Sequence, residues 1–136
     1  MSKILIIEDE AAIRRVLTKI LSEENDSYKV EEAEDGLQGI EKVKNEDYDL
    51  ILCDIKMPKM DGVEVLEAVK KIKPEIPMVM ISGHGDLETA INTMRLGAFD
   101  YISKPPDLNR LLNTVRNALD KKQLVQRGDV KEYYSE

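Results

Sequence analysis

Four segments with the composition of β-strands are each followed by side chains that can act on phosphoryl groups. They are Glu8, Asp9 and Glu10 after 4–7, Asp54 after 50–53, Ser82 after 78–81 and Lys104 after 100–103. Neighbouring carboxylates repel each other, and a hard divalent cation such as Mg²⁺, which takes oxygen ligands, would relieve that repulsion. With the metal bound, Asp54 could attack a phosphoryl donor as a carboxylate nucleophile. The ammonium and hydroxyl groups would then contact the phosphoryl oxygens.

Two hydrophobic periods alternate along the chain and predict the elements that must position these residues. Continuous apolar runs cover 4–7, 50–53 and 78–81, and more polar strand candidates cover 28–33 and 100–103. Stripes of apolar residues with helical spacing cover 13–21, 37–43, 63–69, 87–94 and 108–119. Such alternation predicts an α/β fold in which helices cover both faces of a parallel sheet. Polar second and fifth strands suit the edges of a doubly wound, five-stranded sheet of flavodoxin-like order 2-1-3-4-5 with five helices.

Each of the polar side chains also has a simpler interpretation when it is taken alone. Asp9 or Glu10 could cap a helix or lie in its first turn, where negative charge is favourable. Asp54 and Ser82 could be ordinary turn residues, and Lys104 could be a solvated surface charge. In the predicted order, however, the four strands involved are neighbours, and sheets of this type bind ligands at the carboxyl ends of their strands. Their joint placement therefore favours one site.

The composition restricts the class of protein. The chain has 136 residues, which suits one domain, and a formal net charge of −7. Nucleic-acid binders are normally basic, so we expect no direct binding of nucleic acid by this chain. Cys53 is the only cysteine, which excludes an internal disulfide and favours the reducing cytoplasm. We also expect no secretory signal and no membrane helix, which needs an apolar run of ~20 residues.

Four motifs together resemble those of receiver domains in two-component response regulators. They are the acidic pair in EDE, the segment DIKMPKMDG, the pair Ser82-Gly83 and the pair Lys104-Pro105. Each motif is common by itself, but all four in this order at strand ends form a specific set. The likeness covers residues 2–120. The segment GHGDLETAINTMRLGAFDYISKP further resembles receivers of the nitrogen-regulator type, which occur in enhancer-binding activators.

The resemblance implies a phospho-acceptor and a metal site. By this likeness Asp54 accepts the phosphoryl group, and Glu8 and Asp9 are the acidic pair that binds the metal. The metal would be Mg²⁺ or Mn²⁺, and its protein ligands would be Glu8, Asp9, Asp54 and the main-chain carbonyl of Lys56. Many receivers have two aspartates where this chain has Glu8 and Asp9, and glutamate in the first place is also familiar in the family.

The resemblance also implies a set of residues that respond to phosphorylation. Ser82 would supply the switch hydroxyl, Tyr101 the switch aromatic ring and Lys104 the ammonium that contacts the phosphoryl group. In the family the peptide bond between Lys104 and Pro105 is cis. The side chains of Lys56 and His84 would modulate how fast the acyl phosphate hydrolyses, although a lone loop histidine is more often simply solvated.

These roles describe a phosphorylation-activated signalling switch. A sensor histidine kinase would donate the phosphoryl group, whose charge would bias a two-state equilibrium. The face made by the fourth helix, the fifth strand and the fifth helix would change and control an output domain or effector, in transcription regulation. The chain would be a substrate with modest self-catalysis and not a dedicated enzyme. A homodimer could form through that face or through the last helix.

Other classes with a similar layered architecture fit the sequence less well. A Toprim-type enzyme needs an Asp-x-Asp pair, but Asp54 is followed by Ile55 and Lys56. A haloacid-dehalogenase-type phosphatase needs a second aspartate two residues after a nucleophile on the first strand, and Asp9 does not lead into that pattern. A flavin-binding electron carrier needs a phosphate loop, and EDEAA is acidic there. A receiver that is never phosphorylated and serves only as an interaction module is the remaining alternative.

The last segment is predicted to lie outside the domain. Residues 1–120 would form the receiver domain, and 121–136 would form an extension of the last helix and a linker or tail. The apolar stripe continues into Leu124 and Val125, so the helix could reach about Arg127, where Gly128 would end it. This extension suits a dimerising linker helix and a frayed helix end equally well.

Overall fold

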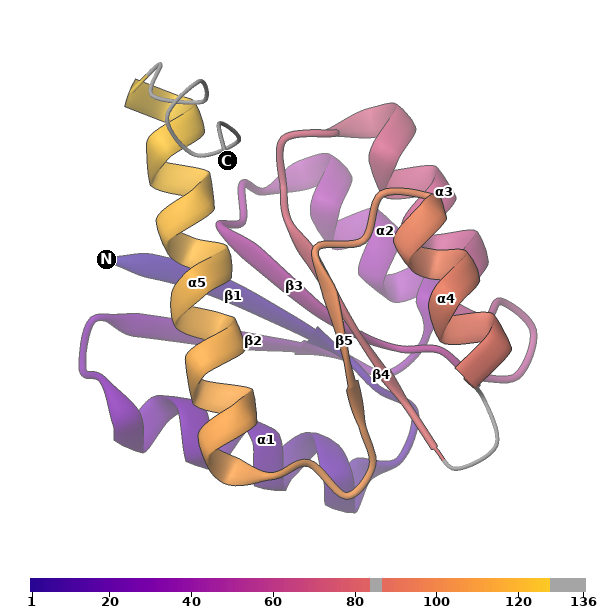
Figure 1. Ribbon diagram of the computed structural model, residues 1–136, viewed down its shortest axis with the longest axis horizontal. Coiled ribbons are helices and arrows are strands. Elements are labelled where there is room, and N and C mark those ends of the chain that lie inside the picture. Colours follow the sequence, from indigo (N-terminus) through magenta and orange to yellow (C-terminus); the bar gives the residue numbers. More distant parts are fainter. Residues whose placement is uncertain (84–86, 128–136) are drawn as a thin grey trace.

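Strands and helices alternate along the chain in the computed structural model (Figure 1). It describes residues 1–83 and 87–127, and for 122–127 it describes the backbone alone. The strands are β1 (Ser2–Ile7), β2 (Tyr28–Ala33), β3 (Leu50–Asp54), β4 (Met78–Ser82) and β5 (Asp100–Ser103). The helices are α1 (Ala11–Glu24), α2 (Gly36–Asn45), α3 (Gly62–Ile72), α4 (Leu87–Arg95) and α5 (Leu108–Arg127).

All strands are parallel, and their order is β2-β1-β3-β4-β5, which confirms the predicted fold class. The register aligns the strand ends, since Ile7 of β1 pairs with Cys53 of β3 and Ser82 of β4 pairs with Ser103 of β5. Residues that follow these strands therefore meet at one edge of the sheet, as the sequence predicted.

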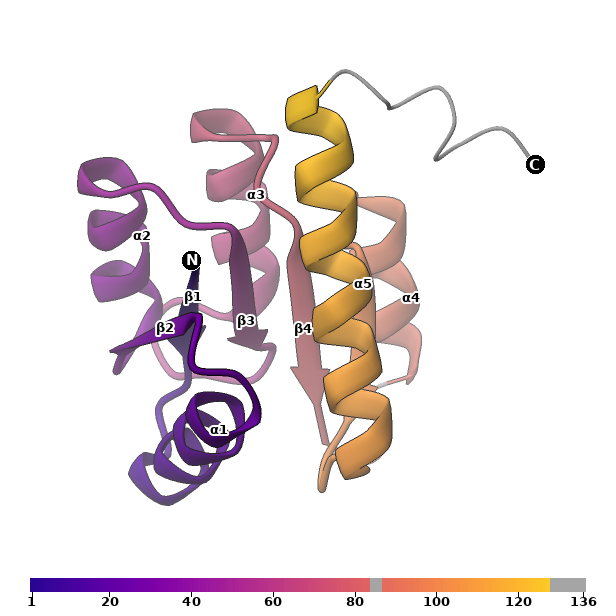
Figure 2. The same cartoon turned by 90° about the vertical axis from the view of Figure 1, so that its left-hand side faces the viewer.

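Alternate side chains of the inner strands point to two separate cores. In β1, Leu5 and Ile7 join a core with residues of α2 and α3, whereas Ile4 and Ile6 join a core with residues of α1 and α5. Figure 2 shows helices on both sides of the sheet. Every residue of β3 and β4 is buried, while β2 and β5 are partly accessible. The prediction that the second and fifth strands form the edges is confirmed.

The helix ends follow local chemistry. The side chain of Asp61 accepts the N–H of Glu64 at 2.9 Å, and the side chain of Glu64 accepts the N–H of Asp61 at 3.2 Å, so a capping box starts α3. Helix α5 runs to Arg127 as predicted. Gly128 and the tail lie outside the described residues, and the domain limit at residue 120 stays a prediction. None of the described helices is long and apolar enough to cross a membrane.

Candidate functional site

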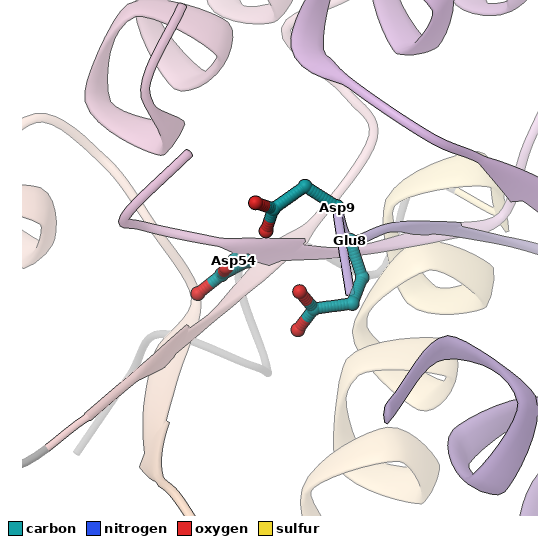
Figure 3. Close-up of side chains that lie close together, drawn as sticks. All are labelled: Glu8, Asp9 and Asp54. Carbon is teal, nitrogen blue, oxygen red and sulfur yellow. The ribbon is translucent and has the colours of Figure 1, made fainter. Parts of the chain in front are cut away.

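Three carboxylates meet at the carboxyl edge of the sheet (Figure 3). Glu8 and Asp9 follow β1, and Asp54 ends β3; one carboxylate oxygen from each lies within 4.8 Å of the others. Glu8 and Asp54 are buried, and Asp9 is exposed. Mg²⁺ binds carboxylate oxygens and keeps several waters, so an oxygen set that is open on one side fits this ion.

Helix capping does not explain these acids. Glu10 is the N-cap of α1, but its side chain makes no capping hydrogen bond, and no acidic residue lies in the first turn. Glu8 turns inward instead, and its Oε2 accepts the N–H of Glu10 at 3.1 Å. Glu10 therefore occupies the N-cap position without a capping hydrogen bond from its side chain, and Asp9 precedes it outside the helix.

Lys104 reaches the carboxylates from the end of β5. Its Nζ lies 2.8 Å from Glu8 Oε1 and 3.1 Å from Asp54 Oδ1. Only 18% of its side chain is exposed, so it is not the solvated surface charge that a lysine usually is. Burial lowers the pKa of Lys104, but the contacts with Glu8 and Asp54 outweigh burial and raise the pKa above its ordinary value. The ammonium thus partly neutralises the acidic cluster.

The Asp54 carboxyl group titrates far from its ordinary range. Burial, and then the charge of Glu8, raise its pKa to about 7, although Lys104 acts in the opposite direction. Each effect has a simple origin, because desolvation and a neighbouring negative charge both penalise the ionised carboxyl group. A divalent cation at this edge would favour the ionised form, which is also the nucleophilic form.

The ends of β4 and β5 are joined at the site. Ser82, the last residue of β4, is buried, and its carbonyl accepts the N–H of Lys104 at 2.7 Å. The peptide bond between Lys104 and Pro105 is cis, which confirms that prediction. Tyr101 in β5 is partly buried and packs against the core that α2 and α3 share with the sheet. The structure thus places the predicted hydroxyl and ammonium groups on adjacent strand ends.

Close packing at the start of α3 holds the main chain of Asp54 and Ile55. The N–H of Gly62 donates to the carbonyl of Ile55 at 2.7 Å. A Cβ on Gly62 would collide with the carbonyl oxygen of Asp54 and lie 2.7 Å from the Cα of Ile55. The sequence did not indicate this contact at Gly62, because a close approach between distant backbones leaves no local pattern.

The comparison with known proteins decides the family. A family model described as response regulator receiver domain matches residues 4–116. The chain belongs to the response regulator receiver family. It is 37% identical over 116 residues to the transcriptional regulatory protein ZraR of Klebsiella oxytoca, which covers 85% of this chain and 26% of the relative. It is 37% identical over 119 residues to the nitrogen assimilation regulatory protein NtrX of Azorhizobium caulinodans, with 86% and 26% covered. The predicted likeness to receivers of the nitrogen-regulator type is confirmed.

Solved receiver structures share the fold. A response regulator receiver domain protein from Clostridium thermocellum has a TM-score of 0.85 and 34% identity, and the match covers 92% of this chain and 99% of that one. NtrX from Brucella abortus has a TM-score of 0.87 and 35% identity, with 94% and 29% covered. The chain spans about a quarter of the length of the curated relatives that it matches.

Two predicted residues of this receiver site stay predictions, and one buried residue beside the site was not predicted. The side chain of Lys56 is exposed, and its carbonyl stays a predicted metal ligand. His84 lies outside the described residues. Arg14 was missed: it is buried, and its guanidinium donates to the carbonyl of Glu8 at 2.7 Å. A signal was present, because Arg14 lies three residues before Leu17 and seven before Leu21 on the buried face of α1.

Proposed function

We propose that this receiver is a phosphorylation-activated switch in which Asp54 accepts the phosphoryl group. The supporting observation is the convergence of Glu8, Asp9, Asp54 and Lys104 from three separate strand ends. An isolated acidic pair has many uses, but a buried acceptor carboxylate with a metal-binding pair and an ammonium matches the needs of phosphoryl transfer.

The transfer step needs little covalent chemistry from the protein. An oxygen of Asp54 attacks the phosphorus atom of a phosphohistidine, the new P–O bond forms, and the P–N bond breaks. The imidazole nitrogen leaves with the electron pair and takes up a proton. Glu8, Asp9 and Asp54, with the carbonyl of Lys56, would hold Mg²⁺ or Mn²⁺, which neutralises charge on the transferring group.

The phosphorylated state differs from the resting state mainly in charge. A phosphoryl group adds nearly two negative charges and three acceptor oxygens at Asp54. Lys104, now paired with two carboxylates, and the hydroxyl of Ser82 would turn to those oxygens. Movement of Ser82 gives space to the ring of Tyr101, so the face made by α4, β5 and α5 changes. The side chains of Lys56 and His84 modulate the lifetime of the acyl phosphate.

The partners follow from this mechanism. A sensor histidine kinase supplies the phosphoryl group, and an output domain or effector protein reads the changed face to control transcription. The receiver itself is a substrate with modest self-catalysis and not an enzyme. It acts in the cytoplasm, binds no nucleic acid directly, and can form a homodimer through α5 or through the face of α4, β5 and α5.

Intact mass spectrometry after incubation with acetyl phosphate tests the acceptor. We expect one phosphoryl adduct on the wild type in the presence of Mg²⁺, and no adduct when the metal is chelated. Asp54→Asn should form no adduct, while the control Glu67→Gln, an exposed carboxylate on α3, should behave like the wild type.

The outcomes separate the alternatives. An adduct that persists in Asp54→Asn would assign the phosphoryl group to another residue. Folded wild-type protein that forms no adduct, either with acetyl phosphate or with a phosphorylated kinase, would instead favour the interaction module that is never phosphorylated.

A further inference from the structure

A buried arginine lies directly behind the acidic pair. Arg14, in the first turn of α1, is 9% exposed, although arginine is rarely buried unless its charge is paired. Arg14 is neither a predicted metal ligand nor the ammonium group that would contact the phosphoryl group, so those roles do not explain its burial. Its position therefore needs another explanation.

The guanidinium of Arg14 connects three elements. Its Nη1 donates to the main-chain carbonyl of Glu8, at the end of β1, at 2.7 Å. Its Nε donates to Glu32 Oε1, in β2, at 3.0 Å. Thr18, one turn later in α1, donates to the other oxygen of Glu32 at 3.0 Å. Both oxygens of Glu32 are thus occupied, and the orientation of the guanidinium is fixed.

This connection restrains the segment that carries the acidic pair. The N–H of Glu8 donates to the carbonyl of Ala33 at 3.1 Å, and the carbonyl of Glu8 accepts from Arg14. The main chain of Glu8 is therefore held on both sides. Its side chain is directed inward to Lys104, and Asp9, the next residue, has its carboxylate beside Asp54.

We propose that Arg14 is a positioning residue for the metal site, which holds the main chain of Glu8 so that the carboxylates of Glu8 and Asp9 face Asp54. The inference rests on the proposed function, since it concerns the metal site of that mechanism. Charge alone cannot give Arg14 this role, because a cation near a cation site weakens metal binding. The geometry of the guanidinium, which spans a carbonyl and a carboxylate, supplies it.

The charge of Arg14 and its positioning of Glu8 predict opposite changes in Mg²⁺ affinity when the arginine is replaced, so a binding experiment can distinguish them. Titration of metal-free protein with Mg²⁺, followed by the amide NMR shifts, gives a dissociation constant without any phosphorylation. We expect Arg14→Gln to weaken Mg²⁺ binding by about tenfold, as is typical when a residue that supports a metal ligand is removed. The matched control is Arg15→Gln, which removes the same charge from the adjacent, exposed residue. It should leave binding unchanged or make it slightly tighter.

The NMR spectra also report the position of the segment itself. Before metal is added, the amide shifts of Glu8, Asp9 and Glu10 should differ from the wild type in Arg14→Gln and not in Arg15→Gln. Arg14→Lys keeps the charge but cannot span both acceptors, so we expect it to bind Mg²⁺ more weakly than the wild type. This variant carries the test if Arg14→Gln does not fold.

Two results would overturn the inference while leaving the proposed function intact. One is wild-type protein that binds Mg²⁺ together with an Arg14→Gln variant that binds it equally well or more tightly. The other is Arg14→Lys with the affinity of the wild type. Folded wild-type protein that does not bind Mg²⁺ at all would contradict the metal-dependent mechanism first.

Discussion

The charge of Asp54 is unfavourably placed in the metal-free protein. Burial and Glu8 raise the pKa of Asp54 from 3.8 to about 7, so the folded state holds the proton more tightly than the unfolded chain. The stability that this difference contributes is complete below pH 3.8 and is lost as the pH rises through about 7. A cation that joined the site would favour the ionised form of Asp54 and would therefore stabilise the folded protein.

Asp54→Asn should remove this pH dependence, because an amide does not titrate. In the presence of a chelator, we expect its free energy of unfolding to increase relative to the wild type as the pH rises from about 4 to about 7, by at most about 1.4 kcal/mol per pH unit. Urea unfolding at a series of pH values measures the difference. Glu67→Gln should follow the wild type. If the free energies of unfolding of Asp54→Asn and the wild type changed in parallel with pH, the pKa of Asp54 would not be raised in the folded protein.

Residue types in the sequence predicted the site better than they predicted side-chain directions. The predicted strand order brings the strand ends together, so the clustering of the carboxylates that follow them could be predicted from the topology alone. The sequence did not indicate that Glu8 is buried while its neighbour Asp9 is exposed. Nor did it indicate that Lys104 contacts Glu8 as well as Asp54, since both facts depend on how the loops pack.

At the scale of elements, the start of α3 packs against the main chain of Asp54. In an ordinary helix, alanine is more favourable than glycine by about 1 kcal/mol. At position 62 the added Cβ would meet the backbone of Asp54 and Ile55, which cannot rotate away as a side chain can. Propensity and packing therefore predict opposite signs for the same substitution.

We expect packing to dominate, so that Gly62→Ala lowers the free energy of unfolding by about 2 kcal/mol. It should also slow the phosphorylation of Asp54 by acetyl phosphate, because the acceptor main chain must shift. Asp61→Ala is the control: it removes the cap, which is worth about 1 kcal/mol, and should leave the rate unchanged. A Gly62→Ala variant that is more stable than the wild type would show that the backbone of Asp54 and Ile55 can move to accommodate the added Cβ.

Hydrophobic periods predicted the strands and helices, because the inner strands of a covered sheet are apolar and the helices that cover it are amphipathic. They predicted the burial of individual residues only in part. Continuous apolar runs predicted β1, β3 and β4, whereas β2 and β5 were predicted from more polar segments, and the five described helices lie where stripes were predicted. Within those stripes, however, Val16, Leu37 and Ile91 are 56%, 62% and 45% exposed. A stripe shows that a helix is amphipathic, and the width of the face that the sheet covers is set by packing. Arg14 shows the opposite, because it is a charged residue that is buried on the covered face of α1.

At the scale of the whole molecule, contacts in the unphosphorylated protein connect the site to β5 and α5. Lys104 follows β5, and Arg110 in α5 donates from Nη2 to the carbonyl of Tyr101 at 2.9 Å. A change at Lys104 can therefore reach Tyr101 and α5 through β5. The helix α2, which packs on β1, β2 and α3, is outside this connection.

Phosphorylation should accordingly perturb one side of the receiver. We expect acetyl phosphate with Mg²⁺ to shift amide NMR signals in α4, β5 and α5 more than those in α2, because the phosphoryl group draws Ser82 and Lys104 toward it. Ser82→Ala should still become phosphorylated but show smaller shifts in β5 and α4. Equal shifts in α2 and α4 would contradict a directed switch.

An apolar groove lies beside the site. Its volume is about 480 Å³. It is lined by Ala12, Ile13, Val16, Leu17, Gly83, Lys104, Pro105 and Pro106. A kinase that presents a phosphohistidine to Asp54 must cover the surroundings of the site, whereas acetyl phosphate needs only the site itself. The two donors therefore probe different areas of the molecule.

Val16→Glu, a substitution at an exposed position in the groove, should separate the two donors. We expect transfer from a phosphorylated histidine kinase to slow by at least about tenfold, since a desolvated charge in an apolar contact costs more than about 1.4 kcal/mol. Phosphorylation by acetyl phosphate should stay as in the wild type, because Val16 is an exposed residue of α1 and is not one of the charged groups of the site. Leu37→Glu, equally exposed but on α2, is the control and should affect neither donor. Equal slowing of both donors by Val16→Glu would place its effect on the site, and unchanged kinase transfer would exclude the groove as the docking surface.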